Sequence, residues 1–267
     1  MTSDTKHSVL GVMIDGVDYA GAVGRVMAAA RERRPYAVSA LAVHGLMTGV
    51  LDPAHRYRLN SFEMLCPDGQ PVRWALNGMH GAGLADRVYG PNLMLHVCEQ
   101  AAADGVPVFL FGGNEDLLAA LSSNLQRRFP DLQIAGARAS KFRTLTPDER
   151  QELVAEIRDS GAGVTFVGLG CPRQEVFAYE MREEVSMPLL AVGAAFNFHA
   201  GQLDQAPKWM QDRGLEWFYR LVKEPRRLWK RYGLLNPLYV TLLAAQWSGL
   251  WRPTHPGDPP RAQVCYG

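Results

Sequence analysis

Short apolar runs that end in glycine or a polar turn alternate with helical patterns over about the first 200 residues, and this alternation constrains the fold most strongly. Strands are predicted at residues 9–14, 36–43, 62–66, 106–111, 132–135, 164–167 and 189–192, with helices between most of them. Strands that alternate with helices form mostly parallel sheets covered on both faces. The sequence therefore predicts an α/β fold with a Rossmann-like, mostly parallel sheet and helices on both faces.

Four loops that follow predicted strands carry glycine or polar residues. They contain Asp68, Gly112, Gly170 and Asn197. Ligands of open α/β sheets bind beyond the carboxyl ends of the strands. We therefore expect these loops to lie on one edge of the sheet and to form the ligand site.

Two of these loops are glycine-rich and precede predicted helices. Gly112, Gly113 and Asn114 suit the approach of a phosphate to a helix N-terminus, although a tight turn without ligand explains them equally well. The absence of a GxGxxG pattern argues against a dinucleotide cofactor. The second loop, residues 168–175, ends in polar groups that suit a nucleotide base, a ribose or a sugar, and its alternative is a capped helix with solvated side chains. Its candidate binding residues are Gly170, Pro172, Gln174 and Glu175.

Asp68 lies in a Pro-Asp-Gly turn directly after a predicted strand. A carboxylate there can serve as a general base if burial raises its pKa toward the working pH. An aspartate in such a turn is more often only a turn former. Both interpretations stay open on spacing alone.

The chain divides into an α/β domain at residues 1–206, a basic aromatic segment at 207–252 and a proline-rich tail at 253–267 that we expect to be disordered. Residues 213–231 carry a net charge of +5 with aromatic residues interleaved. This segment fits a solvated helix face, an interfacial membrane helix or a nucleic-acid patch. The nearly uncharged stretch that follows favours the membrane, and the whole-chain net charge of +1 disfavours a nucleic-acid partner.

No metal, cofactor or disulfide is expected. The four cysteines are widely spaced without a CxxC pair, which indicates reduced thiols in a cytosol. His44 and His199 stand alone after strands, and no HExxH or Asp-x-Asp motif is present. The opening residues do not follow the pattern of a signal peptide, and no apolar stretch reaches the ~20 residues that a spanning helix needs.

Taken together, residues 9–232 resemble the WecG/TagA/CpsF family of bacterial glycosyltransferases, glycosyltransferase family 26. Five motifs in order carry the resemblance: PDGQPV at 67–72, RVYGPNL at 87–93, FLFGGNED at 109–116, FVGLGCPRQE at 166–175 and a long block at 191–232. Each motif alone is weak, but the ordered set is specific.

The resemblance implies an inverting, metal-independent transferase that moves a sugar from a UDP-sugar to a polyprenyl-diphosphate-linked acceptor in bacterial cell-surface polysaccharide biosynthesis. It implies that Asp68 is the catalytic base and that Gln174 binds substrate. It also implies a C-terminal basic helical appendage that contacts the membrane and completes the site with arginines, for which the candidates are Arg220, Arg226, Arg227 and Arg231. The expected location is cytoplasmic and peripheral, on the inner face of the plasma membrane, and family members can self-associate.

The chain departs from the family pattern at two positions. Ser39 begins Ser-Ala-Leu where members often carry Thr-x-Asn, and Asn197 replaces the acid of an FDF pattern. Both are retained as substrate-binding candidates, and the donor is left open between a hexose and an N-acetylhexosamine. Two other functions stay open: a Rossmann-type oxidoreductase, which would bind nicotinamide or flavin, and a non-catalytic membrane-associated scaffold, which would bind UDP without transferring sugar.

Overall fold

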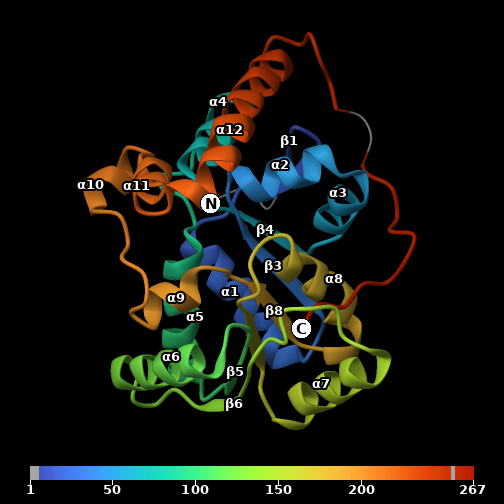
Figure 1. Cartoon of the computed structure of the whole chain (residues 1–267), viewed down its shortest axis with the longest axis vertical. Helices are drawn as coiled ribbons and strands as arrows, with labels where there is room; N and C mark the ends of the chain where they lie inside the picture. The colour runs from blue at the N-terminus through green and yellow to red at the C-terminus, as the bar shows by residue number, and fades with distance from the viewer. Residues whose placement is uncertain (1–5, 254–255) are drawn as a thin grey trace.

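The computed structural model describes residues 6–253 and 256–267, apart from the side chains of Arg227, Lys230 and Arg231. Its centre is a six-stranded parallel sheet in the order β4-β3-β8-β7-β5-β6 (Figure 1). The strands are β3 (Tyr36–Leu41), β4 (Met64–Pro67), β5 (Val108–Phe111), β6 (Ile134–Arg138), β7 (Val164–Val167) and β8 (Pro188–Ala191). The predicted parallel α/β sheet is confirmed.

Helices cover both faces of the sheet. One face carries α1 (Tyr19–Glu32), α5 (Gly90–Asp104), α6 (Glu115–Arg128) and α9 (Ala195–His199). The other carries α2 (Val43–Leu51), α3 (Pro53–Asn60), α4 (Gln70–His80), α7 (Pro147–Asp159) and α8 (Arg173–Val185). Neighbouring strand residues feed opposite cores, since Phe109 and Phe111 pack on the second face while Val108 and Leu110 pack on the first.

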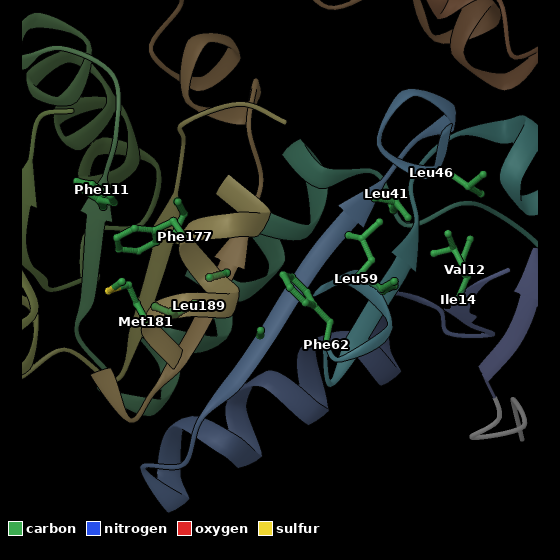
Figure 2. Packing of buried hydrophobic residues seen from close by; sticks show 14 of the residues in the cluster. Val12, Ile14, Leu41, Leu46, Leu59, Phe62, Phe111, Phe177, Met181 and Leu189 are labelled. Atoms are coloured by element: carbon green, nitrogen blue, oxygen red, sulfur yellow. The ribbon is translucent and has the colours of Figure 1, made fainter. Parts of the chain in front are cut away.

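The second core extends beyond the sheet. Phe111, Phe177 and Leu189 pack at its centre, and Leu59 and Val12 continue it toward the N-terminal strands (Figure 2). Close helix packing there uses glycine, because a Cβ at Gly45 or Gly49 would lie 2.6 Å or 2.7 Å from a leucine side chain. These glycines lower the helical propensity of α2, and neither α2 nor α3 was predicted.

The predicted strand at residues 9–14 is instead a hairpin of β1 (Lys6–Val9) and β2 (Val12–Asp15). Leu10 and Gly11 form its turn with φ values of 53° and 87°. A short hairpin and a single buried strand both appear in a sequence as a run of apolar residues. The prediction of one strand was therefore wrong. The sequence Thr146-Pro147-Asp148-Glu149, by contrast, predicts a capping box at a helix start, and α7 begins with that box at Thr146 and Glu149.

The C-terminal appendage is helical. It comprises α10 (Lys208–Asp212), α11 (Glu216–Lys223) and α12 (Pro225–Trp247), and α12 stands over α2 and α4 at one end of the molecule (Figure 1). No helix within the described ranges is both long and apolar enough to cross a bilayer.

Residues 254–255 of the tail expected to be disordered lie outside the described residues, whereas the segment at 256–267 makes backbone hydrogen bonds with the domain. It runs past α3 and back to the loop before α7 (Figure 1). Asp258 donates its backbone N–H to Pro53, and Tyr266 forms a β-bridge with Thr144. Backbone hydrogen bonds between Gly267 and Arg143 complete this contact, so main-chain pairing holds a segment whose composition alone indicated disorder.

Candidate functional site

A cavity of about 1020 Å³ lies between the carboxyl edge of the sheet and the appendage. Its walls come from the ends of β3, β4, β7 and β8 and from α11 and α12, which places the predicted loops around one space. Eight of the predicted site residues line it: Asp68, Gly113, Asn114, Gly170, Gln174, Glu175, Asn197 and Arg220.

Asp68 follows the last residue of β4 and faces the cavity. Its side chain is 16% exposed, its Oδ2 accepts the Gly90 N–H at 3.3 Å, and its Oδ1 lies 3.8 Å from Arg87 Nη1. Burial raises the pKa of the Asp68 carboxyl to about 7, because the nearby Arg87 charge only partly offsets the loss of water. The group is therefore poised to exchange a proton near neutral pH.

Arg87 and Tyr89 connect Asp68 to the appendage. Arg87 Nη2 donates to Glu216 Oε2 at 2.7 Å, and the Tyr89 hydroxyl donates to Glu216 Oε1 at 3.0 Å. The Arg87 guanidinium also stacks 4.2 Å from the centre of the Tyr89 ring. Since Arg87 is closer to Glu216 than to Asp68, its charge is mainly paired with the appendage.

The first turn of α8 forms a second polar group under the cavity floor. Glu175 Oε1 accepts bonds from Ser39 Oγ at 3.0 Å and Gln174 Nε2 at 2.9 Å. Gln174 Oε1 accepts the Gly170 N–H at 3.1 Å, which fixes the amide relative to the loop. Burial raises the pKa of Glu175. Ser39 is fully buried beneath Glu175 and does not line the cavity.

The glycine pair after β5 serves backbone packing as well as the cavity. Gly112 has φ +125°, and a Cβ there would lie 2.7 Å from the backbone of Gly168 in the neighbouring loop. Gly113 and Asn114 reach the cavity wall, but the Asn114 side chain accepts the Leu117 N–H at 2.9 Å and caps α6. The N-terminus of α6 therefore points its backbone toward the cavity edge.

The remaining predicted residues are less central. Pro172, Gly112 and Arg226 do not line the cavity, and Arg226 is exposed. The side chains of Arg227 and Arg231 lie outside the described part of the chain. Asn197 donates from its amide to Gln202 at 3.3 Å, and His199 Nε2 lies 2.8 Å from the Pro91 carbonyl oxygen.

One group of described side chains has donor atoms of the kinds that hold a metal. His55, Cys171 and Glu175 place one such atom each within 4.8 Å of one another. A single Zn²⁺ with bonds of about 2.0–2.3 Å needs its ligand atoms at roughly 3.3–3.8 Å, and Glu175 Oε1 already accepts two hydrogen bonds. A closed structural Zn²⁺ site uses four protein ligands, and this group offers three.

Three residues of the site were not predicted. In the sequence, Arg87 and Tyr89 belong to the RVYGPNL motif, and Glu216 belongs to the basic segment. Their one sequence signal is Glu216 itself, an acid at the start of a strongly basic aromatic helix. Pairing between residues more than 120 positions apart has no local pattern.

The comparison with known families agrees with this geometry. The model of the Glycosyl transferase WecG/TagA/CpsF family matches residues 7–253, nearly the whole chain. This match excludes the oxidoreductase alternative and implies a nucleotide-sugar donor and a lipid-linked acceptor. The chain belongs to the WecG/TagA/CpsF family and is a glycosyltransferase of cell-surface polysaccharide biosynthesis.

Proposed function

We propose that this chain is an inverting, metal-independent transferase that moves a hexose or N-acetylhexosamine from a UDP-sugar to a polyprenyl-diphosphate-linked acceptor. The observation that carries the proposal is Asp68, a largely buried carboxyl group at the wall of a large cavity with a pKa near 7. Such a group removes a proton from an acceptor hydroxyl as that oxygen attacks the anomeric carbon. UDP leaves from the opposite face of the sugar, so a single displacement inverts configuration.

The leaving diphosphate needs positive charge and hydrogen-bond donors. Arg220 of α11 and Gly113, at the N-terminal side of α6, both line the cavity. Arginine and helix N-termini stabilise phosphate charge as it develops. Gln174 and Asn197 supply further polar groups on the same wall, which suits a sugar or a uracil.

The acceptor side of the cavity is apolar. Residues of α11 and α12 that line it include Trp217, Leu228, Tyr232, Val240 and Leu243. Such a wall fits the first isoprene units of a lipid carrier better than a free sugar. We infer that the appendage lies on the inner face of the plasma membrane, where the acceptor is anchored.

The first test is thermal unfolding with a panel of UDP-sugars, with UDP, GDP-mannose and NAD as controls. A ligand that binds only the native state raises its stability, so UDP and one UDP-sugar should raise the melting temperature. Transfer to a polyprenyl-diphosphate-sugar acceptor is then measured with that donor, with and without excess EDTA. UDP binding without transfer would favour the scaffold alternative, and loss of transfer in EDTA would contradict metal independence.

A further inference from the structure

Glu216 is an acid at the start of a basic helix, and it points into the α/β domain. Its two carboxylate oxygens bind Arg87 and Tyr89, at 2.7 Å and 3.0 Å. The Glu216 side chain is 13% exposed, while α11 as a whole has no buried residue. This one side chain therefore makes the main polar contact between α11 and the domain that carries Asp68.

The same contact determines which carboxylate the Arg87 guanidinium pairs with. Arg87 is 8% exposed and has two carboxylates within reach, Glu216 at 2.7 Å and Asp68 at 3.8 Å. A buried guanidinium without Glu216 would have Asp68 as its nearest anion. A close, fully formed Arg–Asp pair stabilises the ionised aspartate and makes it a weaker proton acceptor.

We propose that Glu216 is a positioning residue that holds Arg87 back from Asp68, so that Asp68 is a competent proton acceptor only when α11 is docked. The inference rests on the proposed role of Asp68 as the base. Docking of the appendage would then act twice, by closing the cavity and by freeing the carboxylate from its arginine. An enzyme whose acceptor is in the membrane would thereby avoid deprotonating water beside the donor, and so hydrolysing it, when the appendage is displaced.

Other groups also face Asp68, and the effect of Glu216 has to be separated from theirs. The Gly90 N–H and Arg220 lower the pKa of Asp68, and Arg87 does so most strongly among the charges, whereas Glu216 raises it. The ionisable neighbours from other elements are Tyr19 of α1, Cys66 of β4 and Tyr89. Of the described groups that shift the pKa of Asp68, Glu216 and Arg220 come from the appendage, and they have opposite signs.

The test is a carboxyl ¹³C NMR titration of aspartate-labelled full-length protein, with the Asp68 resonance assigned by its absence in D68N. In the unaltered protein the Asp68 resonance should titrate near pH 7. Glu216→Gln keeps an oxygen that can accept from Tyr89 and Arg87 but removes the charge. We expect the Asp68 titration to move to lower pH by about one unit or more, because Arg87 then pairs with Asp68.

Two control variants separate charge from docking. Asp212→Asn removes the same charge from the appendage but touches only Lys208, and Tyr89→Phe removes one Glu216 hydrogen bond without changing charge. Both should leave the Asp68 titration near its original position. An unchanged titration in Glu216→Gln, or an equal shift in Asp212→Asn, would overturn the inference.

The titration needs no substrate, so the two proposals fail separately. If the expected shift occurs in a chain that transfers no sugar, the proposed function is wrong and the coupling stands. If the chain transfers sugar and Glu216→Gln neither shifts the titration nor moves the acidic limb of the pH–rate profile, the coupling is wrong and the function stands.

Discussion

At the scale of single residues, the proposed chemistry depends on Asp68, a carboxyl group whose surroundings suit a general base. Asp68 sits in a turn that holds its backbone through a bond from its N–H to Leu41, and Gly90 supports its Oδ2. Neither contact alone distinguishes a catalyst from a turn former. The distinction comes from burial, which raises the pKa to about 7 and cannot be read from a Pro-Asp-Gly triplet.

Asp68→Asn is expected to lower kcat by about 10²–10⁴-fold with little change in folding, because the amide cannot accept the proton. In the unaltered enzyme kcat/KM should rise with pH up to about 7 and level off above it, since the base works only when ionised. The measurement is a pH–rate profile with the donor identified by thermal shift. Near-normal turnover in a folded Asp68→Asn protein would show that another group is the base.

Gly112→Ala tests whether the close approach of the Gly112 backbone to Gly168 requires a residue without a Cβ. A Cβ would meet the Gly168 backbone at 2.7 Å, and φ +125° is unfavourable for alanine. We expect a loss of about 1–3 kcal/mol in the free energy of unfolding, measured by urea denaturation. Gly24→Ala is the matched control, because no atom lies within 4 Å of a Cβ there and alanine favours the helix. Equal stability of the two variants would contradict the steric argument.

Sequence reasoning worked for residues whose role depends on their place along a strand. The loops of Asp68, Gly112, Gly170 and Asn197 are expected on one edge because parallel strands end there, and each segment contributes residues to one cavity, although Gly112 itself does not line it. It failed for Arg87 and Glu216, whose partnership depends on how the appendage packs. It also gave Ser39 a role in binding substrate, whereas the hydroxyl bonds to Glu175 below the cavity.

At the scale of elements, strong local signals predicted helix starts well. The capping box of α7 follows from Thr146, Pro147 and Glu149 alone, and all its bonds are present. α2 was missed because its glycines serve packing against Leu41 and Leu59, which only the folded chain reveals. The β1–β2 hairpin was missed because its turn residues, Leu10 and Gly11, carry no strong turn signal.

Thr146→Ala should remove one half of the α7 capping box. The Thr146 hydroxyl accepts the Glu149 N–H at 3.3 Å, and its loss leaves a helix N–H without that partner. We expect a decrease of about 1 kcal/mol in the free energy of unfolding. Thr146→Ser keeps the hydroxyl and should retain most of the stability. If serine and alanine destabilise equally, the methyl group of Thr146 and not the cap is responsible.

At the scale of the whole molecule, the appendage combines an apolar surface with positive charge. Its exposed large apolar side chains are Trp209, Trp217, Phe218, Val222, Trp229, Leu234, Leu238, Val240, Trp247 and Leu250. Arg220, Lys223 and Arg226 lie among them on α11 and α12. Exposed apolar side chains interspersed with cations along a helix are typical of a segment that lies in the headgroup region of an anionic bilayer.

The double variant Phe218→Ser, Val222→Ser tests this membrane role at two positions that do not themselves line the cavity. Both side chains are exposed on α11, so the free energy of unfolding should stay nearly constant. Each apolar side chain contributes about 1.5–3 kcal/mol when fully buried, so vesicle binding should weaken at least about tenfold in sedimentation with phosphatidylserine-containing vesicles. Leu51→Ser, which replaces an exposed leucine at the end of α2 outside the cavity lining, is the control and should bind as the unaltered chain does. High salt should weaken the vesicle binding of the unaltered chain, the double variant and the control, because it screens the cations. If the double variant sediments like the control, α11 does not insert, and the acceptor must reach the cavity by another surface.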